Sequence, residues 1–437
     1  MLKGLRSLSV SAMLRAISTV SINKLDPLMH RKYSITSVLL LKYSSLLVLL
    51  AGLPRLYVPD ANAVAFRLPN QDPEAIARGN AFAATADNPS AIYYNPAGIT
   101  QLEGQTISAG VYLISADTTY TSPTGAKAHT DAKFQPVPQI YYVYSPTNSA
   151  LSFGVGVYAP YGLSLDWQNP PFRTIADSGK LLYATVNPVV AWKVHRTFSI
   201  GIGPTLNYSE AELKQGIGIL PNDQFRFKGH GVDYGFNAGM MWQPHEQWSF
   251  GVNYRYLTTV NYRGESEAKP LFPPRGSSAK IRFPQFVVGG VSFRPTEKWN
   301  LEFDVDWTDW DNVNEINFKN TSFGTLPFVV NYQSGFMYEF GITRKLPKGY
   351  YASLGYFFSE NSSPDKYFNP IVPDGDLYLG SCGVGHKGQR WDFALAYHFA
   401  SNGSGRDVKG SLAKGGLADG NYKTFNQAVN LSAAFKF

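Results

Sequence analysis

The chain has 437 residues and a formal net charge of +7, with 16% charged and 14% aromatic residues. Its mean hydropathy of −0.18 excludes a bundle of membrane-spanning helices, although strands that alternate polar and apolar residues give a similar average. The basic excess is concentrated in the N-terminal extension and does not indicate nucleic-acid binding. The single cysteine, Cys382, excludes an intrachain disulfide and a metal site built on cysteine pairs.

The first element that the sequence predicts is an export signal. An apolar run from Ser45 to Leu53 follows a basic stretch and precedes Ala61-Asn62-Ala63, an A-x-A type of cleavage site. A membrane anchor is the alternative, but it needs roughly 20 uninterrupted apolar residues. We expect residues 1–63 to form an N-terminal extension and signal peptide, cleaved after Ala63 or Ala65, with Met29 as an alternative start.

Residues 64–104 differ in composition from the rest of the chain. Small residues dominate 72–86, where a short helix is expected. The pairs Asn88-Pro89 and Asn95-Pro96 mark turns, because the residue before a proline is disfavoured in helical backbone. This segment therefore precedes the strands as a separate unit.

From Gln105 onward the sequence alternates between polar and apolar residues, which is the period of a β-strand. In the last strand Phe425, Leu431 and Phe437 share one parity, and the chain ends on an aromatic residue, as bacterial outer-membrane barrels usually do. We expect about fourteen strands, near 105–120, 132–146, 149–161, 181–194, 197–211, 229–243, 246–262, 278–294, 297–318, 331–346, 349–359, 376–388, 389–401 and 421–437.

The two strand faces and the connections favour a membrane barrel over a soluble sandwich. Glu302, Asp304 and Asp306 occupy one face of a single strand, which suits a hydrated lumen better than a dry core. Short connections such as 244–246 alternate with long polar ones such as 360–375, as periplasmic turns and extracellular loops do. The predicted class is all-β, a transmembrane antiparallel barrel.

The segment before the strands resembles the FadL/TodX family of outer-membrane transporters for long-chain fatty acids and other hydrophobic compounds. The resemblance rests on Ala65-Phe66-Arg67-Leu68, Ala77-Arg78-Gly79-Asn80-Ala81-Phe82 and Asn95-Pro96-Ala97-Gly98, in this order between an export signal and a barrel. It implies a monomeric fourteen-stranded barrel (105–437) in the outer membrane, with a hatch, or plug (64–104), inside the lumen. The hatch and gating residues would be Phe66, Asn95, Pro96 and Ala97.

The third predicted strand also resembles the family's, which has an inward kink that opens the wall sideways. The matching residues are Gly154, Gly156, Pro160 and Gly162. Glycine within a strand favours a bulge, and proline removes a ladder donor. An ordinary strand end with a Tyr-Gly turn is the alternative. The resemblance implies passive transport, in which rearrangement of the hatch releases the ligand through this opening into the outer membrane.

The resemblance also implies a basic site for a ligand's head group, but the chain departs from the family there. Residues 209–212 are acidic where a cation is expected, and Asn317 takes the second basic position. Lys214 and Lys319 are the nearest candidates, with a solvated loop position as the alternative for each. The expected partners are a long-chain fatty acid or an aromatic or alkane ligand, together with outer-membrane lipid or detergent. No cofactor or nucleic acid is expected.

Two other functions fit the sequence less well. His398 and Ser401 approach an outer-membrane phospholipase motif, but a spacing of three places them on opposite strand faces. The other histidines show no metal-ligand spacing, so neither a catalytic nor a metal site is predicted. A general hydrophilic porin would have a wide charged lumen without a hatch, and residues 64–104 argue against it.

Overall fold

The computed structural model describes residues 65–412 and 415–437, all within the unit Asp60–Phe437. The predicted extension and signal peptide (1–63), with Met29 and Ala63, lie outside the described residues. Within those residues, every helix is too short or too polar to cross a lipid bilayer. The helices are α3 (Pro73–Ile76), α4 (Ala91–Tyr94), η1 (Pro96–Gln101), η2 (Trp310–Asn312), η3 (Pro347–Gly349) and η4 (Asp365–Tyr367).

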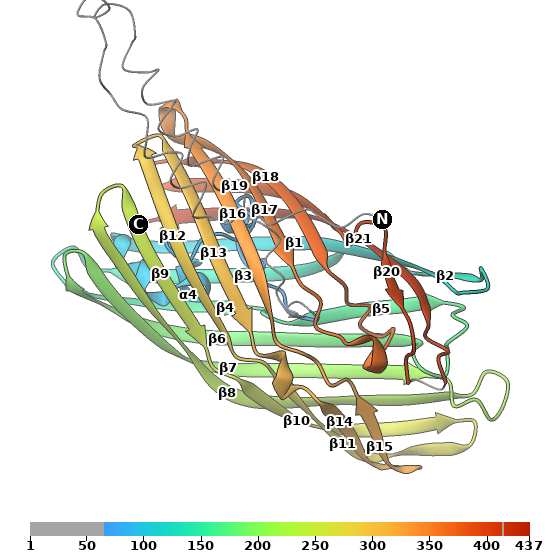
Figure 1. Cartoon of the computed structure of the whole chain (residues 1–437). Coiled ribbons are helices and arrows are strands. Elements are labelled where there is room, and N and C mark those ends of the chain that lie inside the picture. The colour runs from blue at the N-terminus through green and yellow to red at the C-terminus, as the bar shows by residue number, and fades with distance from the viewer. Residues whose placement is uncertain (1–64, 413–414) are drawn as a thin grey trace, which may run out of the picture. The chain divides into compact units, whose positions relative to one another are not determined.

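The strands form one antiparallel sheet that closes on itself (Figure 1). They are β1 (Gly104–Thr121), β2 (Lys127–Thr130), β3 (Gln135–Ser145), β4 (Leu151–Tyr158), β5 (Gly162–Gln168), β6 (Ser178–His195), β7 (Phe198–Gln215), β8 (Gln224–His245), β9 (Trp248–Arg255), β10 (Thr258–Lys269), β11 (Phe272–Phe283), β12 (Phe286–Thr296), β13 (Trp299–Thr308), β14 (Glu315–Thr321), β15 (Gly324–Val329), β16 (Gly335–Lys345), β17 (Tyr350–Ser359), β18 (Leu377–Lys387), β19 (Trp391–Ser401), β20 (Arg406–Val408) and β21 (Gly420–Lys436).

Closure of the ring is achieved by the first and last strands. β1 pairs with β3 on one side and with β21 on the other, where Thr106 lies opposite Lys436. Several wall strands are interrupted and appear as two pieces, such as β4 with β5 and β9 with β10. Counted as wall strands, the pieces give the closed 14-strand antiparallel barrel that the alternation predicted.

The predicted division into two strand faces is also confirmed. In β19 the residues of one parity are exposed apolar side chains, among them Phe393 and Phe399, both at least half exposed. The alternate residues, such as Ala396 and His398, are buried. An outer face of exposed apolar side chains and an inward face of buried small or polar side chains is the pattern of a barrel in lipid.

Residues 65–103, called the inner segment below, pack against the inward-facing side chains of the wall. Together with wall residues they form a cluster of buried side chains that includes Phe82, Ile92 and Tyr93. A second, aromatic cluster contains Phe66 and Phe283. The core of this protein therefore lies between the inner segment and the wall.

Candidate functional site

The three acids of β13 face the inside of the barrel, as predicted, but they do not face a hydrated lumen. Glu302, Asp304 and Asp306 are each no more than 1% exposed. The expectation of a wet environment was wrong because the inner segment covers this part of β13. These carboxylates instead supply hydrogen-bond acceptors for buried N–H groups that no water reaches.

Two of these acids cap a turn of the inner segment. Asp304 Oδ2 accepts hydrogen bonds from the backbone N–H groups of residues 82 and 83, each at 2.8 Å. Glu302 Oε1 accepts from the N–H groups of residues 84 and 85, at 2.7 and 3.0 Å. Four successive backbone donors are thereby satisfied by two side chains of one strand, and this fixes the turn against the wall.

Two buried ion pairs complete the attachment to β13. Arg67 binds Asp306 through both guanidinium NH groups, at 2.6 and 2.8 Å, and also donates to Thr308 at 2.6 Å. Arg78 binds Glu302 at 2.7 Å. Because every side chain in these two pairs is at most 4% exposed, removing one partner would leave an uncompensated buried charge.

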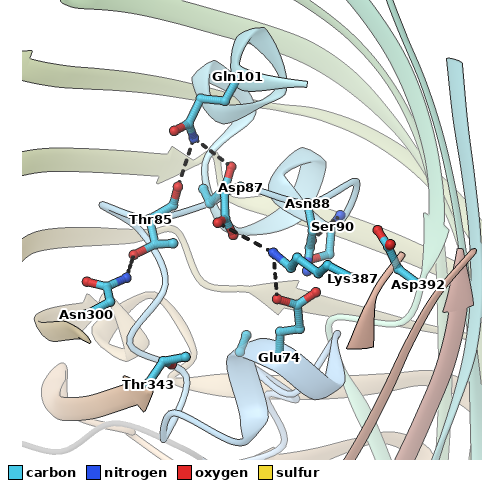
Figure 2. Close-up of polar contacts among 12 residues, drawn as sticks. Glu74, Thr85, Asp87, Asn88, Ser90, Gln101, Asn300, Thr343, Lys387 and Asp392 are labelled. Carbon is cyan, nitrogen blue, oxygen red and sulfur yellow. Dashed lines mark hydrogen bonds and ion pairs between the residues drawn. The ribbon is translucent and has the colours of Figure 1, made fainter. Parts of the chain in front are cut away.

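A lysine at the end of β18 holds the inner segment from another side. Figure 2 shows Lys387 between two carboxylates, with Nζ 3.1 Å from Glu74 and 3.5 Å from Asp87. The same view shows Gln101, whose Nε2 donates to the carbonyl oxygens of residues 85 and 86. Ion pairs and hydrogen bonds therefore link α3, the turn at 85–88 and η1 to one another and to the wall.

Asp72 caps α3 and carries a shifted pKa. Its Oδ1 accepts from the N–H of Glu74 at 2.9 Å and from Asn88 Nδ2 at 3.0 Å. Burial and the neighbouring Glu74 carboxylate raise the pKa of Asp72 to about 7, against these hydrogen bonds, which lower it. This carboxyl group therefore titrates near neutral pH.

The Asn95-Pro96-Ala97 turn joins two parts of the inner segment to the wall. Asn95 Oδ1 accepts from the N–H of Ala97 at 3.2 Å, which caps η1. Its Nδ2 donates to the carbonyl of Ala83 at 2.7 Å and to that of Met240 in β8 at 2.9 Å. The side chain of Asn95 is fully buried, so it satisfies buried carbonyls that would otherwise be unpaired.

Strand glycines let the inner segment approach the wall closely. A Cβ at Gly251 of β9 would overlap the carbonyl oxygen of Ala83, and a Cβ at Gly355 of β17 would overlap the backbone nitrogen of Gly79. Glycine in a strand weakens it and often marks the close approach of another backbone. These two glycines therefore mark where the inner segment contacts the wall.

The third wall strand is broken between Tyr158, the end of β4, and Gly162, the start of β5. On one side β6 pairs with both pieces. On the other side β3 pairs with β4 only from Ile140 to Tyr144, and residues 135–139 pair with β1 alone. The wall therefore lacks a ladder between residues 135–139 and 162–166.

This gap is a bounded window. β2 pairs with β5 where His129 lies opposite Gln168, so the wall is closed again beyond the gap. The β3 edge of the window contains Pro136 and Pro138, which are two positions apart and so share one parity of the strand. Because proline has no backbone N–H, neither residue leaves an unpaired backbone donor at this edge. These prolines were not among the predicted site residues, although two prolines in one strand are a signal for an unpaired edge.

A pocket of about 570 Å³ lies at the window. Charged residues stand among its lining, including Lys133, Lys180 and Asp374, but apolar side chains dominate it. The apolar lining includes Leu68, Val137, Pro138, Val157, Tyr158, Tyr161, Leu163, Leu165, Leu181, Leu182, Tyr183, Val372 and Leu377.

The four residues predicted to shape the lateral opening in the third strand lie in two different places. Pro160 and Gly162 lie at the break, and Gly162 lines the pocket. Gly154 and Gly156 lie within β4, where both neighbours continue the ladder. A Cβ at these two positions would come within 2.8 and 3.0 Å of Ile92 in the inner segment.

The start of the inner segment is bonded to the broken strand. Leu68 N–H donates to the carbonyl of Pro160 at 2.8 Å, and Gly162 N–H donates to the carbonyl of Phe66 at 3.0 Å. The Phe66 ring packs against Trp310, with ring centres 4.7 Å apart, and against Phe283. Phe66, predicted as a gating residue, is thus next to the window.

The two lysines predicted for a head group do not line this pocket. Lys214 forms an ion pair with Glu212 at 3.4 Å in β7. Lys319 is exposed in β14 and alternates with the buried Phe318. Their role with a ligand stays a prediction.

A family model described as outer membrane protein transport protein (OMPP1/FadL/TodX) matches residues 57–437. The chain belongs to the OMPP1/FadL/TodX family. Over 351 residues it is 22% identical to the long-chain fatty acid transport protein of Escherichia coli O6:H1, in an alignment that covers 69% of this chain and 78% of the relative. This family consists of outer-membrane transport proteins, so the predicted location is confirmed, and so is the prediction that the chain is not an enzyme.

Solved structures agree with the family in fold. A Pseudomonas aeruginosa FadL homologue superposes with a TM-score of 0.74 at 18% identity and covers 86% of this chain and 100% of its own. The toluene transporter TbuX of Ralstonia pickettii superposes with a TM-score of 0.66 at 16% identity, covering 84% of this chain and 98% of its own. These likenesses show the barrel fold.

In this member of the OMPP1/FadL/TodX family, His398 is buried against the inner segment. Its Nδ1 lies 3.2 Å from Asn70 Nδ2 and its Nε2 lies 3.3 Å from Tyr112 Oη. Ser401 belongs to the opposite strand face, as its spacing predicted. Among the residues that the structure describes, no group of three or more His, Cys, Asp or Glu side chains is placed to hold a metal ion.

Proposed function

We propose that this protein carries hydrophobic small molecules across the outer membrane by passive lateral diffusion through the window between β3 and β5. The supporting observation is the apolar pocket of about 570 Å³ at the window. Outward-facing residues beside it are apolar and exposed, among them Val157 at 42% and Leu182 at 53%. An apolar molecule that leaves here enters hydrocarbon directly and never meets water, which is the favourable direction.

The inner segment acts as the hatch (64–104, described from 65) of the barrel formed by residues 105–437. Its first residues, 66–68, are bonded to 160–162 at the edge of the window. Opening requires these two backbone hydrogen bonds and the Arg67–Asp306 ion pair to break, while Glu302 and Asp304 continue to hold residues 82–85 of the hatch. Phe66 is the gating side chain, and the Asn95-Pro96-Ala97 turn is part of the fixed portion.

The ligand class is a long-chain fatty acid or another hydrophobic molecule, such as an aromatic or alkane. The relative from Escherichia coli is named for long-chain fatty acids and the Ralstonia pickettii structure for toluene. The protein works as a monomer surrounded by outer-membrane lipid, without a cofactor.

The test is a substitution that narrows the window. A Cβ at Gly162 would meet Leu68 Cδ1 at 2.9 Å, so Gly162→Val obstructs the path between hatch and β5. Gly289→Val is the matched control, since nothing lies within 4 Å of a Cβ there. We expect uptake of a labelled hydrocarbon or fatty acid to fall strongly in the first variant only, with both barrels assembled.

A hydrophilic porin would behave differently in the same experiment. Its solutes travel along the barrel axis, so small sugars would enter through the wild type and both variants at one rate. Rapid sugar entry, together with hydrocarbon uptake that is unchanged in Gly162→Val, would reject lateral transport.

A further inference from the structure

Among the residues that the structure describes, three arginines are buried inside the barrel, and one of them has no anionic partner there. Arg67 and Arg78 form the ion pairs with Asp306 and Glu302 described above. Arg255 of β9 is 5% exposed, and no carboxylate of the described residues is within ion-pairing distance of it. A buried charge without a counter-charge is unfavourable, so it calls for an explanation.

The side chain of Arg255 forms only one hydrogen bond within the described part of the chain. Its NH2 group donates to Tyr158 Oη at 2.6 Å. Its Nε is buried without a partner, as are Tyr93 Oη and Asn253 Oδ1 nearby. The guanidinium otherwise faces the rings of Tyr93, Tyr158 and Phe286, at 5.2 to 5.8 Å from their centres. Aromatic faces attract a cation but do not accept hydrogen bonds in the plane of the guanidinium.

The position of Tyr158 connects Arg255 with the window. Tyr158 is the last residue of β4 and lines the pocket. Its hydroxyl accepts from Arg255 and donates to Asn187 Oδ1 at 2.8 Å. The cation therefore lies directly behind one side chain of the pocket wall, at the point where the third wall strand breaks.

We propose that Arg255 is the binding site for the carboxylate of a hydrophobic acid whose apolar tail occupies the window pocket. Rotation of Tyr158 vacates the place now taken by its hydroxyl, and the carboxylate accepts hydrogen bonds from the guanidinium. Arginine suits this task because its planar donors match a carboxylate in a two-bond arrangement. Tyr93 of the hatch supplies a further donor through its unpaired hydroxyl.

This inference rests on the proposed function, because it takes the pocket to be the ligand site. It adds the ligand class, a hydrophobic monocarboxylate in preference to a neutral hydrocarbon. It also assigns the head group to a residue other than Lys214 and Lys319, neither of which lines the pocket.

The experiment compares two probes of equal chain length, laurate and 1-dodecanol, binding to the purified full chain in lipid nanodiscs. Arg255→Met removes the charge with an unbranched side chain, and Arg282→Met is the control, because Arg282 is exposed on β11. We expect Arg255→Met to lose about tenfold or more in laurate affinity, since a charge-assisted pair is lost. Dodecanol affinity should be unchanged, and Arg282→Met should match the wild type with both probes.

The outcomes separate this inference from the proposed function. Equal laurate affinity in Arg255→Met and the wild type overturns the Arg255 site, while dodecanol binding in both still supports the hydrophobic pocket. Failure of the wild type to bind either probe overturns both. If Arg255→Met does not assemble, Tyr158→Phe decides: without the competing hydroxyl, laurate should bind at least as tightly as in the wild type, and weaker laurate binding refutes the proposal.

Discussion

The contact between hatch and window can be tested by removing the Arg67 charge. Arg67→Met deletes both bonds to Asp306 and the bond to Thr308, and leaves a carboxylate that is 1% exposed without a counter-charge. Breaking a buried pair on one side typically costs about 3–5 kcal/mol. Because Leu68 and Gly162 form the adjacent backbone bonds, this cost should appear as easier local opening there.

Hydrogen exchange of the Leu68 and Gly162 amides measures that opening. A change of about 1.4 kcal/mol is tenfold, so protection should fall by roughly two to four powers of ten. Amides in the seam between β1 and β21 should be unaffected, which makes them the internal control.

A second variant separates the effect of losing the ion pair from the effect of losing the packing of the Arg67 side chain. Arg67→Met combined with Asp306→Leu removes both charges, so most of the lost protection should return. Unchanged protection of Leu68 and Gly162 in the single variant would refute the idea that Arg67 holds the hatch at the window. Equal losses in the single and double variants would show that the charge pair is not the cause.

Three further perturbations address the fixed part of the hatch. Gly251→Ala places a Cβ on the carbonyl of Ala83, so the hatch should become sensitive to protease, whereas Gly289→Ala, with open space, should not. Asn95→Ala leaves two buried carbonyls unpaired, at about 1–3 kcal/mol each, and uptake of hydrophobic compounds should fall while the barrel assembles; wild-type uptake would contradict this. The raised pKa of Asp72 gives stability that is complete below pH 3.8 and is lost as the pH rises through about 7. Hatch protection, corrected for intrinsic exchange, should therefore be higher at pH 5 than at pH 8, and Asp72→Asn should abolish the difference.

The barrel could be predicted from the amino-acid sequence, because a strand in lipid has a local signature. Alternation with period two, as in the stretch that ends at Phe437, requires only neighbouring residues to be read. The same holds for the alternating short and long connections and for the Asn-Pro turns that set residues 64–104 apart from the strands.

Contacts between residues far apart in the chain could not be predicted in this way, because they depend on the folded arrangement. Arg67 and Asp306 are 239 positions apart, and nothing local pairs them. The alternation within β13 predicted a lumen face for its three acids, but the inner segment covers them in the folded chain. Similarly, the break after Tyr158 is a window only because residues 135–139 of β3, which pair with β1, have no partner on the side of β5. Arg255 lacks a counter-charge because closure of the ring surrounds it with aromatic rings and, among the described residues, with no carboxylate in ion-pairing distance. Such features depend on the register and closure of the whole sheet, and hence on all strands at once.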